Sequence, residues 1–277
     1  MKPLFTELTL MCFLTGSCTA APTIETEPEI ENGQEKTDEN KTEDMTNPFN
    51  FETKTVKLNS GWEMPIIGIG TYLLSTAQAE ESVYNALKVG MRLIDTADIY
   101  GNEVGVGRGI ARAMKDFGIK REEIFVTTKL WTSDFYRADE EIDERLERLG
   151  LEYIDLLLLH HTAANDEHAY QAMERGVKAH IAPLGTILES WFPLGGRGTG
   201  IRTLNNLDVI KSIASAHGKS TYQVLLRWHL QSGVIAIPGS TNAQHIAEDY
   251  DIFDFSLTDA EMASIDALER NQRFASY

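Results

Sequence analysis

Short apolar runs alternate with amphipathic stretches over most of this 277-residue chain, and three of the apolar runs end on an ionisable side chain. These three runs are Arg92 to Asp95, Ile124 to Lys129 and Asp155 to His160. Apolar runs separated by helical patterns are typical of parallel strands joined by helices. The pattern therefore predicts βα units, and a chain of this length with 42% hydrophobic residues can bury one large core.

The ionisable ends of these runs are expected to meet. In a parallel barrel the carboxyl ends of the strands converge on one face, where enzymes of this architecture keep their active sites. Asp95, Lys129 and His160 stand at three such ends, and Tyr100 follows Asp95 closely in the sequence. We expect these four side chains to lie together.

The string from Asp95 to Glu103, with the pattern D-T-A-x-x-Y-G-N-E, resembles the aldo-keto reductases. The resemblance extends over residues 53 to 268. It implies an α/β fold of the TIM type with an N-terminal β-hairpin, and a nicotinamide cofactor bound without a Rossmann domain. It also implies the NAD(P)H-dependent reduction of an aldehyde or ketone to an alcohol, with a small carbonyl compound as substrate.

Carbonyl reduction requires a hydride at carbon and a proton at oxygen, and Tyr100 is the expected proton donor. A lysine ammonium beside the phenol favours the phenolate, so we expect Lys129 to lower the pKa of Tyr100. Asp95 would hold Lys129 by an ion pair, and neutral His160 would orient the carbonyl or share proton delivery. No metal is expected, because no supporting carboxylate spacing accompanies the histidines.

Only six buried strands can be counted, whereas a closed barrel of this type has eight. The gap lies between His160 and Thr186, where the sequence leaves room for one helix. By comparison with a barrel of ordinary size, about fifty residues are missing there, which removes strands 5 and 6 with their helices. We expect a barrel truncated to about six parallel strands, either closed under strain or open with its gap covered by Ala169 to Val177.

The resemblance also implies cofactor contacts. Trp191 matches the aromatic residue on which the nicotinamide ring stacks, and Leu194, Gly195 and Gly196 match the loop over the pyrophosphate. Gly70, Thr71 and Asp95 lie at strand ends that face the same site. The family's Ser-Asn pair and Gln that hold the carboxamide belong to the two missing strands.

At the adenosine end, Gly239 replaces the family's lysine and His245 replaces its arginine, which removes cations that select the phosphorylated dinucleotide. We therefore expect NADP as the cofactor, with NAD as the alternative. The residues expected to contact this end are Ser240, Thr241, His245, Glu248 and Asp249.

Three aromatic residues follow the first and third strands of the predicted barrel: Tyr72, Trp131 and Phe135. They predict an apolar substrate mouth, with packing at the barrel rim as the alternative. The chain carries a formal net charge of −17 and has no basic stripe that could track phosphates. Nucleic acid is therefore not an expected partner, and a monomer is expected.

The N-terminal region differs from the rest of the chain. Residues 1–18 have the layout of a short secretory signal, and Cys18 stands where a bacterial lipoprotein would carry its lipid. Residues 19–50 are acidic and predict a disordered tether, which leaves residues 51–277 for the incomplete barrel. We expect an exported lipoprotein of a bacterial envelope that meets the membrane only through Cys18. A soluble secreted form and an uncleaved cytoplasmic protein are the alternatives.

Two functions follow from these patterns. The first is a working NAD(P)-dependent oxidoreductase that uses the Asp95, Tyr100, Lys129 and His160 tetrad. The second is a catalytically impaired remnant that acts as a surface-anchored binding protein, because the predicted deletion removes part of the cofactor site.

Overall fold

The computed structural model of the chain describes residues 47–58, 61–161, 163, 165–177, 188–190, 193–194 and 204–268. The predicted leader, Cys18 and nearly all of the predicted tether lie outside the described residues. Trp191, Gly195 and Gly196 also lie outside them, so those predictions stay predictions.

Six parallel strands form the centre of the described structure. Four of them pair in the order β4 (Gly68–Gly70), β5 (Leu93–Asp95), β6 (Phe125–Leu130) and β7 (Leu156–Leu159). The other two, β8 (Leu188–Ser190) and β9 (Val234–Ala236), pair with each other. A parallel bridge from Ile67 to Ala236 places β9 beside β4. Among the described residues the spatial order is therefore β8, β9, β4, β5, β6 and β7. The truncation to about six strands stays a prediction.

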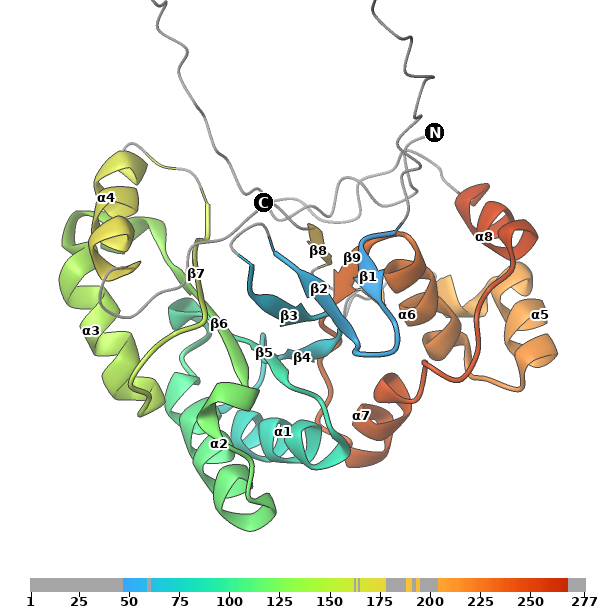
Figure 1. Cartoon of the computed structure of the whole chain (residues 1–277), viewed down its shortest axis with the longest axis horizontal. Helices are drawn as coiled ribbons and strands as arrows, with labels where there is room; N and C mark the ends of the chain where they lie inside the picture. The colour runs from blue at the N-terminus through green and yellow to red at the C-terminus, as the bar shows by residue number, and fades with distance from the viewer. Residues whose placement is uncertain are drawn as a thin grey trace, which may run out of the picture.

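Helices surround these strands in a broad arc, with α1 to α4 on one side and α5 to α8 on the other (Figure 1). The α-helices are α1 (Thr76–Val89), α2 (Glu103–Phe117), α3 (Ala138–Leu149), α4 (Asp166–Val177), α5 (Asp208–His217), α6 (Thr221–Gln231), α7 (Ala243–Tyr250) and α8 (Asp259–Asp266). Short 3-10 helices are η1 (Asp98–Tyr100), η2 (Arg121–Glu123), η3 (Thr132–Arg137) and η4 (Leu204–Asn206).

Capping residues explain where several of these helices begin. Ser75, Ser220 and Thr258 each accept a hydrogen bond from the backbone three residues later, where a Gln or Glu side chain bonds back to the cap. Such capping boxes satisfy backbone N–H groups that have no partner within the helix. The alternation of strands and helices expected from the sequence is thus supported by local signals.

The strands β7 and β8 lie at the two edges of the described parallel strands, and whether the barrel is closed or open stays a prediction. Among the described residues, β7 pairs only with β6, and no ladder joins β7 to β8. Helix α4 packs against α3, η3 and β7 in the outer arc, with Ala169 and Ala172 buried in the core that α3 shares. The buried alanines hold this helix against its sequence neighbours, and that Ala169 to Val177 covers the gap stays a prediction.

An antiparallel sheet closes the amino-terminal end of the strands. It consists of β1 (Phe49–Asn50), β2 (Thr55–Lys57) and β3 (Glu63–Pro65), and the last two confirm the predicted hairpin. Phe49 is buried against the same apolar cluster as Val56 and Leu93. The folded domain therefore includes residues before 51, because the Phe49 side chain, which the sequence analysis assigned to the tether, is buried in the core.

No helix in the described part of the chain is both long enough and apolar enough to cross a membrane.

The contact between α1 and α2 supplies a test of the packing. Gly105 lies within α2, and a methyl group there would stand 2.0 Å from the Thr76 carbonyl oxygen. Alanine usually stabilises a helix relative to glycine by about 1 kcal/mol. We expect Gly105→Ala to destabilise this protein instead, by about 1 to 3 kcal/mol, because the helices must separate.

The free energy of unfolding from urea titration measures this effect, and Arg108→Ala on the exposed side of α2 is the control. Unchanged or increased stability of Gly105→Ala would contradict the described helix contact.

Candidate active site

A buried ion pair joins the ends of β5 and β6. The Lys129 ammonium lies 2.7 Å from both carboxylate oxygens of Asp95, and it donates a further hydrogen bond of 2.9 Å to the Thr96 carbonyl. Burial alone would lower the pKa of Lys129, but the negative charge of Asp95 raises it above its ordinary value. Lys129 therefore stays charged, and the pair ties two adjacent strand ends together.

Tyr100 reaches this pair from η1. A left-handed glycine, Gly101 with φ +65°, ends the short helix. The Tyr100 hydroxyl lies 3.4 Å from the Lys129 Nζ atom. Sequence reasoning placed the two groups together, and the structure does so.

The net shift in the pKa of Tyr100 differs from the expectation. Burial raises the pKa of Tyr100 above its ordinary value, and the opposing effect of Lys129 is smaller. The expected net lowering of this pKa is therefore wrong for the protein without ligands, because the phenolate would be poorly solvated. The phenol keeps its proton at neutral pH, which is the form that a proton donor needs.

His160 completes the group at the end of β7. Its ring lies edge-on to Tyr100, with 5.8 Å between ring centroids, and edge-on to Trp131 at 5.0 Å. Burial, the Lys129 charge and His161 together lower the pKa of His160 to about 3. The imidazole is therefore neutral, as expected. Its Nδ1 atom is buried and has no hydrogen-bond partner within the described residues.

The residues that follow Tyr100 hold the strand ends in place. Asn102 donates hydrogen bonds of 2.8 and 2.9 Å to the carbonyls of Thr71 and Leu74. Glu103 accepts from the Thr128 hydroxyl at 2.7 Å and from Arg148 at 2.8 Å. Sequence reasoning used both residues only as part of a motif and missed these structural roles.

A second carboxyl group stands against the ion pair. Glu189 on β8 is 8% exposed, and its burial together with the negative charge of Asp95 raises the pKa of Glu189 to about 8. Sequence reasoning missed this residue. Its position two residues before Trp191 was the available signal, because alternate residues of a strand share a face.

The predicted substrate mouth is only partly supported. Tyr72 contacts Tyr100 with 5.0 Å between ring centroids, and Trp131 contacts both His160 and His161. Phe135 is fully buried in the core beside α3 and α4, so its assignment to the mouth is wrong. Phe135 is the buried residue of η3, and its burial agrees with the alternative of packing at the barrel rim.

The predicted cofactor residues near the tetrad make hydrogen bonds and packing contacts within the protein. The Gly70 amide donates to the Pro238 carbonyl at 3.1 Å, and the buried Thr71 hydroxyl donates to the Asp95 carbonyl at 3.1 Å. Leu194 is half-buried and packs beside the core between the hairpin and α6. None of these contacts tests cofactor binding.

The adenosine end offers groups that fit a phosphate. Asn242 caps α7, and the Ser240 hydroxyl oxygen accepts from the Asn242 amide at 3.1 Å. Thr241 and His245 are exposed beside this helix start. The N-terminus of a helix together with hydroxyl groups favours anions, so the described residues fit a dinucleotide phosphate.

The two acidic residues of this segment, Glu248 and Asp249, are less exposed than Thr241 and His245. Glu248 is half-buried and accepts a hydrogen bond of 2.9 Å from Gln244. Asp249 is 5% exposed, and its burial together with the negative charge of Glu248 raises the pKa of Asp249 to about 7. Asp249 therefore gains a proton more readily than an ordinary aspartate, and a protonated carboxyl group can donate as well as accept a hydrogen bond.

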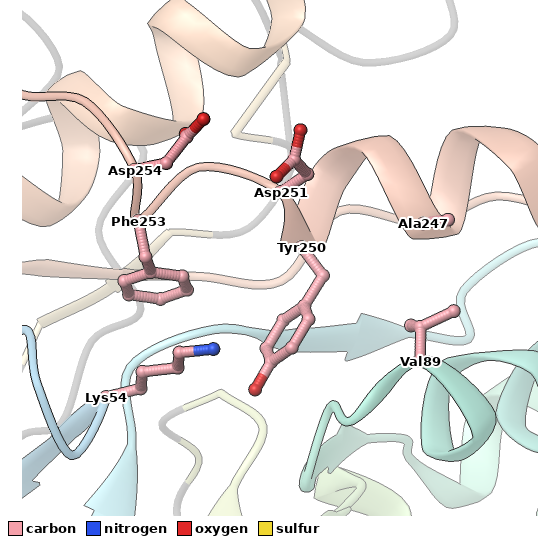
Figure 2. A pocket seen from close by; sticks show the side chains of 7 residues that line it. All are labelled: Lys54, Val89, Ala247, Tyr250, Asp251, Phe253 and Asp254. Carbon is pink, nitrogen blue, oxygen red and sulfur yellow. The ribbon is translucent and has the colours of Figure 1, made fainter.

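A separate pocket of about 480 Å³ lies between the hairpin region and α7 (Figure 2). The Lys54 ammonium stands 4.3 Å from the ring centroid of Tyr250 and 4.7 Å from that of Phe253. None of the four tetrad residues lines this pocket, so it is distinct from the candidate active site.

Comparison with known proteins agrees with this geometry. The model of the aldo/keto reductase family matches residues 66–194 and 197–270. Morphine 6-dehydrogenase of Pseudomonas putida is 36% identical, and the match covers 79% of this chain and 92% of that protein. Glyoxal reductase of Bacillus subtilis is 37% identical, over 79% of this chain and 94% of that protein. This chain belongs to the aldo-keto reductase family. The family reduces carbonyl groups with NADP(H), so membership supports a reductase in general terms.

Solved structures of family members resemble the fold. An aldo/keto reductase from Brucella melitensis has a TM-score of 0.70 and 32% identity, and the match covers 77% of this chain and 98% of that one. A Bombyx mori aldo-keto reductase in complex with NADP has a TM-score of 0.74 and 28% identity, over 80% of this chain and 94% of that one. The expected TIM-type α/β fold is confirmed.

The chain is nevertheless shortened relative to its relatives. Its alignment with the Pseudomonas putida protein extends over 277 positions but uses only 79% of this chain. Part of the relative therefore has no counterpart here, as the sequence predicts. That the loss consists of strands 5 and 6 stays a prediction.

The neutral state of His160 gives a pH-dependent prediction. Its pKa falls from 6.5 to about 3 on folding, so the unfolded chain binds this proton first as the pH falls. The stability that depends on neutral His160 is present above pH 6.5 and is lost as the pH falls toward 3.

We expect the natural chain to lose stability on acidification more steeply than His160→Asn does. Thermal melts at a series of pH values measure the difference. Parallel curves for the two proteins would contradict a lowered pKa of His160.

Proposed function

We propose that this protein reduces an aldehyde or ketone to an alcohol with a nicotinamide cofactor, and that Tyr100 donates the proton. The observation that carries the proposal is the contact of the Tyr100 hydroxyl with Lys129, which is itself held by both oxygens of Asp95. A phenol placed against a fixed ammonium is suited to proton transfer, because the phenolate that it leaves is stabilised by the positive charge.

Each member of the tetrad has a distinct role in this proposal. Lys129 supports negative charge on the Tyr100 oxygen after the proton has moved, and Asp95 keeps the ammonium fixed. Neutral His160 would donate a hydrogen bond from its ring N–H to the substrate oxygen. The bound nicotinamide would supply the hydride. The burial of Asp95 and Lys129 limits water around the ion pair, which strengthens these electrostatic effects.

NADP is the proposed cofactor, and the α7 region is the proposed holder of its adenosine end. Ser240 and Thr241 would donate hydroxyl hydrogen bonds to the 2′-phosphate beside the start of α7. The family's cations are replaced by Gly239 and His245, so we expect only weak discrimination between NADP and NAD. Trp191 and the Leu194 to Gly196 loop are proposed for the nicotinamide and pyrophosphate.

Fluorescence titration with NADPH and NADH is the first test of the proposal. Quenching would show that the shortened barrel binds a dinucleotide. The absence of quenching at millimolar cofactor, in a sample that melts cooperatively, would instead favour the catalytically impaired remnant.

Replacement of Tyr100 tests the proton donor. We expect Tyr100→Phe to lower kcat for carbonyl reduction by about 10²- to 10⁴-fold, because general acid catalysis is lost. Cofactor affinity should change little, since the ring remains. Tyr136→Phe alters an exposed tyrosine and serves as the control. Unchanged turnover in Tyr100→Phe would remove Tyr100 from this role.

Restoring a cation at the adenosine end tests the cofactor assignment. We expect His245→Arg to increase the preference for NADPH over NADH by about tenfold, because a charge-assisted hydrogen bond to the 2′-phosphate is gained. Dissociation constants for both cofactors measure the ratio. An equal change for NADPH and NADH would show that residue 245 does not face this phosphate.

A further inference from the structure

The short helix η1 carries Tyr100, but packing in the core does not hold this helix. All of η1 (Asp98–Tyr100) is described, and none of its residues is fully buried; Ile99 is 48% exposed. A segment that buries little apolar surface gains little stability from packing and opens easily. The position of the Tyr100 hydroxyl therefore depends on the polar groups that hold η1.

Polar contacts fix η1 at both ends. After Tyr100, the Asn102 amide donates to two carbonyl groups of the segment that follows β4. At the start of η1, the Asp98 carboxylate accepts a hydrogen bond of 2.7 Å from Arg148 and lies 3.7 Å from the Arg145 guanidinium. Both arginines belong to α3 and stand three residues apart, on one face of that helix. Asp98 therefore ties the start of η1 to α3.

Arg145 is a well-fixed anchor for this tie. Its side chain is fully buried, and its guanidinium donates to Glu141 at 2.9 Å and to Asp134 at 3.2 Å. Its Nε atom also donates to the Lys129 carbonyl at 3.4 Å. The same guanidinium thus contacts the backbone of Lys129 and the carboxylate of Asp98. It lies between the two segments that bring the phenol and the ammonium of the candidate site together.

We propose that Asp98 is a positioning residue for Tyr100: the two arginines of α3 hold its carboxylate, and this contact keeps the Tyr100 hydroxyl beside the Lys129 ammonium. Asp98 acts through Tyr100 and not on the substrate. Neither the tetrad nor the expected cofactor contacts include this residue. Its effect on catalysis rests on the proposed function, whereas its effect on the place of Tyr100 does not.

Removal of the Asp98 side chain should leave the rest of the fold intact. Arg148 also pairs with Glu103 at 2.8 Å and with Glu144 at 3.4 Å, and Arg145 keeps its two other carboxylate partners. Asp98→Ala therefore leaves neither arginine as an unpaired buried charge, which would be strongly destabilising.

Glu144→Ala is the matched control for Asp98→Ala. Glu144 is a carboxylate partner of the same arginine, Arg148, but it belongs to α3 itself and so does not tie α3 to η1. Asp98→Asn is a second variant, because its side-chain oxygen can still accept a hydrogen bond from Arg148 although its charge is lost. It also supplies the test if Asp98→Ala does not fold.

Tyrosine NMR tests the placement without any assay of activity. In protein labelled with ¹³C at the tyrosine ζ carbon, the Tyr100 signal is the one that Tyr100→Phe lacks. This carbon carries the hydroxyl group, so its signal responds when the phenol moves relative to the ammonium. We expect the Tyr100 signal to shift or broaden in Asp98→Ala, to change less in Asp98→Asn, and to stay in place in Glu144→Ala.

The signal of the exposed Tyr136 should stay in place in all of these variants. A Tyr100 signal that is unchanged in a folded Asp98→Ala protein, or in Asp98→Asn where the alanine variant does not fold, would overturn the proposal.

Kinetic constants test the link to catalysis. We expect Asp98→Ala to lower kcat for carbonyl reduction by about 10- to 100-fold, because a small displacement of a catalytic group is costly. The dissociation constant for NADPH should change little, since Asp98 does not hold the cofactor in the proposal. Asp98→Asn should have an intermediate kcat, and Glu144→Ala should keep the natural kcat. Equal kcat values for Asp98→Ala and Glu144→Ala would overturn the positioning role.

A double variant distinguishes positioning of Tyr100 from a general loosening of the fold. In the Tyr100→Phe protein, Asp98→Ala should lower kcat by no more than about twofold, because the group that Asp98 positions is already gone. A loss as large as that in the natural chain would show a merely structural role and overturn the proposal. If the natural chain reduces no aldehyde or ketone while the Tyr100 signal responds as expected, the proposed function fails and the placement by Asp98 stands.

Discussion

The structure of the site depends on one buried ion pair. Lys129 and Asp95 stand at the ends of adjacent parallel strands, and each would be strongly unfavourable in the core without the other. The pair holds the ends of β5 and β6 next to each other. The Thr96 carbonyl and the Tyr100 hydroxyl also contact the Lys129 ammonium. The charge of Lys129 also contributes to the low pKa of His160.

Around this pair the chain uses polar residues as structural ties rather than as ligands. Asn102 joins the segment after β4 to the start of α2, and Glu103 joins β6 to α3 through Thr128 and Arg148. These bonds are buried and therefore stronger than they would be in water. The sequence motif that indicates the family is thus largely a set of hydrogen bonds that hold the strand ends in position for Tyr100.

The sequence by itself determined the βα alternation, the hairpin, the family and the meeting of Asp95, Tyr100, Lys129 and His160, because strand periodicity and strand ends are local properties of the chain. It did not determine the burial of Phe135, the placement of α4, the raised pKa of Tyr100 or the burial of Glu189. Those depend on which surfaces far apart in sequence exclude water together, and only the tertiary structure decided that.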